Sequence, residues 1–222
     1  MLSIPASRPN AYTGSPLDRV SGRRDEADFV AAQLAREDAL FVPVWRSQSL
    51  LRDNAAGEPE AVLLTPATAE ALRMTAGPAP APPGLAPHGP APWVLLGLFE
   101  EGPLKGRPVF AVDCSAAEDP LPLLSPEMGR FADLRPVAAL MPPGEASLLA
   151  HARGMLHWRS RHRFCGVCGG VCEPRAAGNT LRCANCGTMH FPRTDPAVIM
   201  LILRGDRCLL ANSPRFPDTT MY

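Results

Sequence analysis

Two Cys-x-x-Cys pairs, Cys165 with Cys168 and Cys183 with Cys186, constrain this chain more than any other feature. Fourteen residues separate the two pairs, and a glycine follows each of them. This spacing predicts a four-cysteine zinc site, because each pair can form a tight turn with both sulfurs on one side. All four ligands would be protein sulfurs, which leaves no position for a substrate water. We therefore expect a structural Zn²⁺ rather than a catalytic one.

The cysteines have alternative interpretations. Disulfides would suit a secreted protein, but nothing else in the sequence is typical of secretion. A redox Cys-x-x-Cys pair usually opens a helix, and neither pair precedes a helical pattern. Cys172 could compete as a ligand, although the paired spacing favours the other four. We expect the nearby histidines to be structural or exposed: His151, His157, His162 and His190.

The charge balance argues against some functions. The 222 residues include 22 basic and 22 acidic side chains, which does not favour a general binder of nucleic acid or membrane. Residues 1–12 contain no apolar stretch long enough for a signal peptide. The longest clean apolar run, residues 197–203, is far too short to cross a membrane. We therefore expect a cytoplasmic protein whose remaining thiols are reduced.

The first part of the chain predicts a small α+β domain over residues 25–143, preceded by an N-terminal arm over residues 1–24. Within the domain, residues 77–92 carry a proline at about every second position, which indicates a stiff surface loop. No motif in this domain matches a catalytic signature.

The elements of this domain are expected to be short. A helix is predicted over residues 25–37 and strands over residues 39–45 and 61–64. Pro43 lacks a backbone N–H, so it indicates an edge position or a bulge in its strand.

A second set of elements follows. Thr65 is expected to cap a short helix whose first residue is Pro66. The apolar runs over residues 93–99 and 108–112 predict a β-hairpin or two neighbouring strands.

The clearest helix is expected over residues 145–162, inside a connecting segment over residues 144–163. Basic residues in and after its last turn, Arg159, Arg161 and Arg163, suit the negative end of the helix dipole. They could bind phosphate, or they could simply form a solvated helix end that leads into the ribbon.

The zinc ribbon is expected over residues 164–192, and a further domain begins over residues 193–222. Residues 197–203 form a near-continuous apolar run, typical of a strand buried on both faces. A returning strand over residues 207–211 would complete a hairpin.

Three stretches together resemble one family. They are Phe-Cys-Gly-x-Cys-Gly, the second Cys-x-x-Cys pair, and the linker Phe-Pro-Arg-Thr-Asp-Pro-Ala-Val-Ile over residues 191–199. They are similar to the NADH pyrophosphatases (NAD⁺ diphosphatases) of the Nudix hydrolase superfamily. Zinc ribbons in general do not require that linker after them. The resemblance is therefore specific from residue 165 to residue 199.

The resemblance implies a fold and an activity. The family combines an N-terminal α+β domain, a four-cysteine zinc ribbon and a C-terminal Nudix α/β/α sandwich, and its members are typically homodimers. They hydrolyse the pyrophosphate of NADH or NAD⁺ to nicotinamide mononucleotide and AMP, and some act on NAD-capped RNA. The chemistry uses Mg²⁺ or Mn²⁺ held by glutamates of the Nudix box.

The Nudix box is not found in these 222 residues. No Arg-Glu-x-x-Glu-Glu occurs, and the adjacent glutamates Glu100 and Glu101 fall in an expected loop. Pyrophosphate hydrolysis needs carboxylates that bind divalent metals and activate water. We therefore assign no catalytic residue, and we expect a chain that stops before the box and is inactive alone.

Two substrate contacts are implied by the family's motifs. Phe191, five residues after Cys186, matches an aromatic position that lies against the adenine ring in relatives. Arg135 matches an arginine that contacts substrate, and its planar guanidinium suits phosphate. Phe191 could instead pack the ribbon on the next domain, and Arg135 could be a surface residue.

Two other functions compete with the hydrolase. One is a non-enzymatic zinc-ribbon adaptor that binds nucleic acid or protein, which the missing box and the basic run after residue 158 would support. The other is a catalytically inactive regulator that dimerises with a full-length relative.

Overall fold

The computed structural model describes residues 10–76, 93–195 and 200–210. The chain forms two compact units, residues 1–192 and 193–222, and each is described here by itself. The predicted loop over residues 77–92 lies outside the described residues. In the described part, no helix is both long and apolar enough to cross a membrane.

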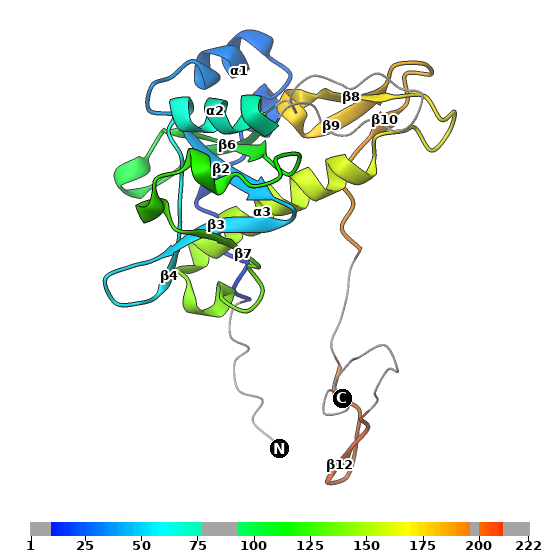
Figure 1. Cartoon of the computed structure of the whole chain (residues 1–222). Coiled ribbons are helices and arrows are strands. Elements are labelled where there is room, and N and C mark those ends of the chain that lie inside the picture. The colour runs from blue at the N-terminus through cyan, green and yellow to red at the C-terminus, as the bar shows by residue number, and fades with distance from the viewer. Residues whose placement is uncertain (1–9, 77–92, 196–199, 211–222) are drawn as a thin grey trace. The chain divides into compact units, whose positions relative to one another are not determined.

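A seven-stranded mixed sheet forms the centre of the first unit (Figure 1). Its strands follow the order β1-β5-β6-β2-β3-β4, with β7 paired to β3. The β2–β6 pair is parallel and the others are antiparallel. The bounds are β1 Leu17–Asp18, β2 Leu40–Trp45, β3 Gln48–Asp53, β4 Pro59–Ala61, β5 Val94–Phe99, β6 Pro108–Asp113 and β7 Arg130–Ala132.

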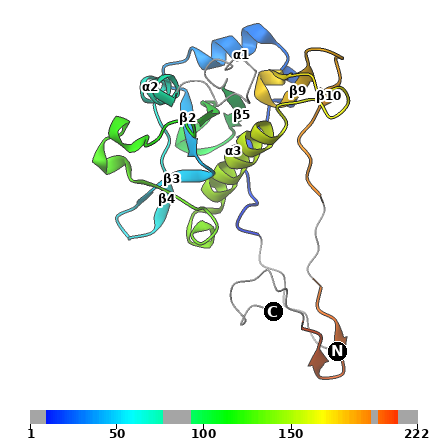
Figure 2. The ribbon, with the colours of Figure 1, turned by 45° about the vertical axis from the view of Figure 1, so that its right-hand side comes forward.

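Helices cover both faces of this sheet. Helix α3 packs along one face, and α1 and α2 lie on the other, as Figures 1 and 2 show from two directions. The α-helices are α1 Ala27–Leu34, α2 Pro66–Ala76 and α3 Pro143–Arg161. Short 3₁₀ turns are η1 Ser21–Arg23, η2 Gly102–Leu104, η3 Leu121–Leu123, η4 Pro126–Met128 and η5 Ala138–Leu140. The α+β fold class predicted from the sequence is confirmed, and its arrangement is three-layered.

Strand alternation explains why the layers form. Leu40, Val42 and Val44 of β2 face the core beneath α3, whereas Phe41 faces the core beneath α1 and α2. Successive side chains of a strand point to opposite faces, so an uninterrupted apolar strand has to be covered on both. The two buried clusters therefore lie on either side of the same strands.

Several predicted elements are confirmed. The predicted hairpin is the antiparallel pair of β5 and β6. Helix α2 begins at Pro66, and the Thr68 N–H lies 3.5 Å from its acceptor, the Thr65 hydroxyl oxygen. The long helix begins at Pro143, two residues earlier than predicted, because proline is favourable in a first helical turn.

The edge position predicted as one alternative for Pro43 was wrong, since β2 lies inside the sheet between β6 and β3. Proline is tolerated there because the pairing on the β3 side is interrupted. Val44 pairs with Ser49 of β3, whereas Phe41 bridges Leu64 instead. Pro43 lies between Phe41 and Val44 in β2, where the hydrogen-bonded ladder is already interrupted. The missing N–H of proline therefore breaks no continuous ladder there.

Two other predictions need correction. The strand expected over residues 61–64 is β4, which ends at Ala61, with only an isolated bridge at Leu64. The described part of the N-terminal arm is not free, because β1 pairs with β5 and Leu17 is buried. Leu17 is the apolar residue of this segment that is fully buried, and Ala11 and Val20 pack beside the core as partly buried residues.

The second unit contains a small hairpin, β11 Leu203–Arg204 with β12 Arg207–Cys208. Of the strand predicted over residues 197–203, Leu203 belongs to β11, whereas residues 200–202 are not strand. The return strand ends at Cys208, and residues 197–199 and 211 lie outside the described residues. Within the described residues of this unit, Met200, Leu201 and Leu209 are more than 60% exposed.

Candidate metal centre

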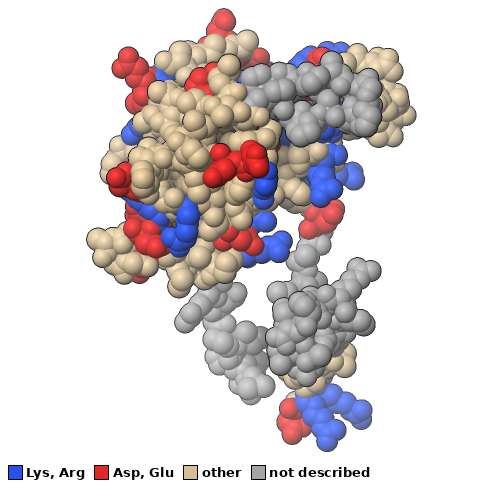
Figure 3. All heavy atoms as spheres, viewed as in Figure 1, with Lys and Arg blue, Asp and Glu red and all other residues tan. Residues whose placement is uncertain are grey.

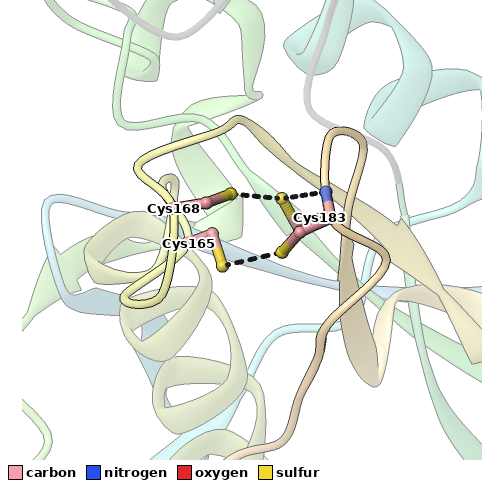
Figure 4. A group of neighbouring side chains, drawn as sticks. Cys165, Cys168 and Cys183 are labelled. Atoms are coloured by element: carbon pink, nitrogen blue, oxygen red, sulfur yellow. Dashed lines mark hydrogen bonds between the residues drawn. The ribbon is translucent and has the colours of Figure 1, made fainter.

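A three-stranded ribbon follows directly from the end of α3. Its order is β10-β9-β8, and a bridge between Phe164 and Val171 closes its first turn. The elements are β8 Cys172–Arg175, the 3₁₀ turn η6 Ala176–Gly178, β9 Thr180–Cys183 and β10 Met189–His190. The two Cys-x-x-Cys pairs occupy the turns at one end of this sheet (Figure 4).

The four cysteine sulfurs converge. All four Sγ atoms lie within 4.8 Å of one another. Cys165 and Cys186 are 3.7 Å apart at Sγ, and Cys168 and Cys183 are 3.5 Å apart. Tetrahedral zinc with Zn–S bonds of about 2.3 Å places its sulfurs about 3.8 Å apart. A disulfide would need about 2.05 Å. The spacing therefore fits a metal ion and not two disulfides.

Backbone N–H groups point at the sulfurs from within each turn. The Val167 N–H donates to Cys165 Sγ at 3.4 Å, and the Cys186 N–H donates to Cys183 Sγ at 3.4 Å. Each turn closes through the glycine after it, since Gly169 and Gly187 donate to the carbonyls of Cys165 and Cys183. Both glycines have φ of 73°, a conformation that other residues rarely adopt.

The local environment favours thiolates at the exposed ligands. The hydroxyl of Thr188 lies 3.1 Å from Cys186 Sγ, and this hydrogen bond is the main cause that lowers the pKa of Cys186 to about 6. The Asn185 side chain donates to Cys168 Sγ at 3.5 Å. The thiolate is the form that binds metal, so these polar contacts prepare the site.

The donor set fits a closed structural zinc. Cys165 and Cys183 are buried, whereas Cys168 and Cys186 reach the surface. Among the described residues the cluster includes no histidine or carboxylate. Cys172 is outside the cluster, although it lies opposite Cys183 in the β8–β9 register. Burial raises its pKa, as do the nearby cluster cysteines, which disfavours the thiolate form that binds metal.

The two predicted substrate residues lie elsewhere. Phe191 follows β10 and is 59% exposed. Arg135 is exposed in the loop after β7, where its backbone N–H donates to Asp133 Oδ1 at 3.2 Å. In the part of the chain that the structure describes, no hydrogen bond, ion pair or ring contact joins either residue to the cysteine cluster.

The ribbon is fixed to the first domain by a contact that sequence reasoning missed. Asn179 is 5% exposed, and its side-chain nitrogen donates to the Leu95 carbonyl at 2.9 Å. Beside it, Gly178 has φ of 85°, and a Cβ there would lie 2.8 Å from the Trp93 carbonyl oxygen. A glycine-asparagine pair usually indicates only a turn, so the sequence carries no signal for this docking role.

The fold and the site together define a class of protein. The family described as "NADH pyrophosphatase-like rudimentary NUDIX domain" matches residues 38–158, which comprise most of the sheet with α2 and α3. The "NADH pyrophosphatase zinc ribbon domain" matches residues 160–191, which contain the four-sulfur cluster. The protein is thus a rudimentary Nudix domain followed by a zinc ribbon.

The chain belongs to the NADH pyrophosphatase (NudC) family, since the first match covers more than half of it. It is 38% identical to the NAD-capped RNA hydrolase NudC of Stutzerimonas stutzeri over 115 residues, 52% of this chain and 40% of the relative. It is 32% identical to the protein of the same name from Pseudomonas aeruginosa PAO1 over 134 residues, 60% of this chain and 42% of the relative. The chain spans about two fifths of the length of these curated relatives.

Proposed function

We propose that this chain supplies the structural zinc site and part of the substrate-binding surface of an NAD(H) pyrophosphatase that hydrolyses NADH, NAD⁺ or NAD-capped RNA. The observation that carries the proposal is the order of the two family matches, a rudimentary Nudix domain followed at once by the ribbon. The domain boundaries expected from the sequence belong to this proposal, as does assembly into a homodimer.

The ion in the ribbon is proposed to be Zn²⁺ held by Cys165, Cys168, Cys183 and Cys186. The distances between the four sulfurs and the backbone N–H groups that point at them support zinc. Among the described residues the cluster contains no oxygen ligand, which a hard cation such as Mg²⁺ would prefer. Four thiolates leave no place for a water, so the metal stabilises the ribbon and takes no part in hydrolysis.

The substrate contacts are proposed to be Phe191 and Arg135. The ring of Phe191 is exposed, so a face is available for stacking against adenine. The side chain of Arg135 makes no hydrogen bond to a described residue, which leaves its guanidinium able to bind a pyrophosphate oxygen.

Hydrolysis itself is proposed to need residues that this sequence does not provide. The Mg²⁺ or Mn²⁺ of the family is held by glutamates of the Nudix box, and the 222 residues contain no Arg-Glu-x-x-Glu-Glu. We therefore propose that the 222-residue chain binds the dinucleotide without cleaving it. The adaptor alternative predicts no dinucleotide binding at all.

A binding titration tests this proposal. NADH fluorescence is followed on addition of the wild-type chain and of the Arg135→Gln and Phe191→Ala variants. Each substitution should weaken binding by about tenfold, the usual effect of losing one charged hydrogen bond or one stacked base. Arg130→Gln is the matched control, because Arg130 is an exposed arginine that already pairs with Asp53 at 3.1 Å. Equal binding by all four proteins would contradict the assignment, and no binding by any would favour the adaptor.

A further inference from the structure

The N-terminal segment runs alongside helix α3 (Figure 2). Leu17 of β1 is buried in the same apolar cluster as Leu148 and Ala152 of α3, which fixes the segment against the helix. Three basic side chains gather there: Arg19 and Arg24 from the segment and His151 from α3. None of them belongs to the metal centre or to the proposed substrate contacts.

One edge of the Arg24 guanidinium has no hydrogen-bond partner. Its Nε and one terminal nitrogen, Nη2, are both buried and have no hydrogen-bond partner. Nε–H and a terminal N–H form one edge of a guanidinium, the edge that binds two oxygens of an anion side by side. Both ring nitrogens of His151 are also buried without a partner. Buried donors without acceptors are costly, so a ligand that supplies acceptors would stabilise this arrangement.

The neighbouring carboxylates do not supply those acceptors. Asp18 Oδ1 accepts from the Val20 N–H at 2.8 Å, and Glu26 pairs with Arg23 at 3.0 Å. Burial, followed by the charge of Arg19, lowers the pKa of Arg24, and Asp18 only partly offsets them. Burial, with added repulsion from Arg19 and Arg24, lowers the pKa of His151 to about 3. The two guanidiniums therefore make this group of side chains positively charged, while the imidazole of His151 is neutral.

We propose that Arg19, Arg24 and His151 form a binding site for a phosphate group. The free edge of Arg24 would bind two phosphate oxygens, and the neutral imidazole of His151 would donate one N–H to a third. Arg19 supplies the second positive charge, so that the two guanidiniums balance a phosphate dianion. A carboxylate has only two oxygens and one charge, which leaves His151 unpaired and one arginine unbalanced.

The test is a thermal melt in inorganic phosphate at fixed pH, with chloride at equal ionic strength as the reference. Phosphate should raise the Tm of the wild-type chain and of the Arg23→Gln control, which removes an adjacent, already paired arginine. Arg24→Gln should lose the phosphate-dependent rise, with an affinity at least about tenfold weaker. Arg24→Lys keeps the charge without the two-donor edge, so it should retain only part of the rise.

Further outcomes decide the proposal and its ligand source. In chloride alone, Arg24→Gln should melt no lower than the wild type, since it removes two buried donor groups that have no hydrogen-bond acceptor. A large loss of Tm there, or an equal phosphate effect in both proteins, would overturn the site. Parallel titrations with 5′-AMP and a short RNA identify the source of the phosphate group. If only the RNA binds more tightly than inorganic phosphate, the site takes a nucleic-acid backbone. If all three bind with equal affinity, it takes a free phosphate or a mononucleotide. Failure of NADH binding would leave this result unaffected, because the probe is inorganic phosphate.

Discussion

Cys172 and Cys183 face each other across β8 and β9, yet only Cys183 joins the four-sulfur cluster. At the scale of single residues, this difference comes from the turns. The Cys-x-x-Cys pairs direct backbone N–H groups at their sulfurs, whereas Cys172 lies within a strand and packs against the apolar core. Spacing in the sequence therefore predicted which cysteines converge, but it could not predict Thr188 and Asn185, whose side chains contact the sulfurs.

The first prediction separates these two cysteines. Cys183→Ser should reduce the metal content well below one zinc per chain, because three thiolates bind zinc far more weakly than four. It should also destabilise the ribbon, whose folding is coupled to metal binding by an energy on the order of 10 kcal/mol. Cys172→Ser is the control and should retain the metal. Metal analysis of the purified variants measures both, and zinc loss in Cys172→Ser would contradict the ligand assignment.

The second prediction concerns His151. Its pKa is lowered to about 3 in the folded chain by burial and by Arg19 and Arg24. An unfolded histidine titrates near 6.5, so between these values the unfolded chain takes up a proton that the folded chain does not. The contribution of neutral His151 to the free energy of unfolding is fully present above about pH 7 and is lost as the pH falls toward 3. Between pH 7 and pH 5, His151 should account for about 2 kcal/mol of that loss.

Denaturant unfolding in phosphate-free buffers checks this slope. His151→Gln should show a flatter dependence than the wild type between pH 7 and pH 5, since glutamine does not titrate. His157→Gln, an exposed residue on the same helix, serves as the control and should keep the wild-type slope. Identical slopes for all three proteins would show that His151 is protonated as readily in the folded chain as in the unfolded one.

At the scale of elements, long patterns were predictable and short connections were not. The apolar runs of β5 and β6 and the helical spacing of α3 identified those elements. Strand β3 was missed, because the two-residue turn before it consists of Arg46 and Ser47 with φ of 49° and 66°. Such turns usually contain asparagine and glycine, so the sequence lacks the ordinary hairpin signal.

The third prediction concerns the docking of η6 on β5. Gly178→Ala places a Cβ 2.8 Å from the Trp93 carbonyl oxygen and imposes a left-handed conformation on alanine. The control is Gly57→Ala, which has φ of 77° but nothing within 4 Å of the new Cβ. Both variants lose about 1 kcal/mol from backbone strain. Only Gly178→Ala should lose a further 1 to 3 kcal/mol, roughly the cost of overpacking.

Hydrogen exchange locates that loss. Amides of residues 172–183 should exchange faster in Gly178→Ala than in the wild type, while those of β2 and β6 stay protected. Asn179→Ala should act in the same direction, because it leaves the Leu95 carbonyl without its side-chain donor. If the two glycine variants were equally stable, the contact between η6 and β5 would not hold the ribbon in place.

At the scale of the molecule, the three-layered domain was not predictable from local patterns. The parallel pairing of β2 with β6 joins strands from distant parts of the sequence and places β2 inside the sheet. Both faces of β2 are apolar because the α3 cluster covers one face and the α1–α2 cluster covers the other. The distribution of charge over the surface was easier to predict. The sequence contains equal numbers of acidic and basic side chains, and on the face shown in Figure 3 the two kinds are interspersed over the described residues.

The most direct test of the account is AMP release. The 222-residue chain, folded and loaded with zinc, is incubated with Mn²⁺ and either NADH or NAD-capped RNA, and AMP or cap removal is quantified. The NAD-capped RNA hydrolase NudC of Stutzerimonas stutzeri is the positive control on capped RNA. The account predicts a background signal from this chain, because we propose that the metal-binding glutamates of a Nudix box are needed to activate water on a pyrophosphate and no Arg-Glu-x-x-Glu-Glu occurs in the 222 residues. Hydrolysis that rises in proportion to the amount of chain would contradict it.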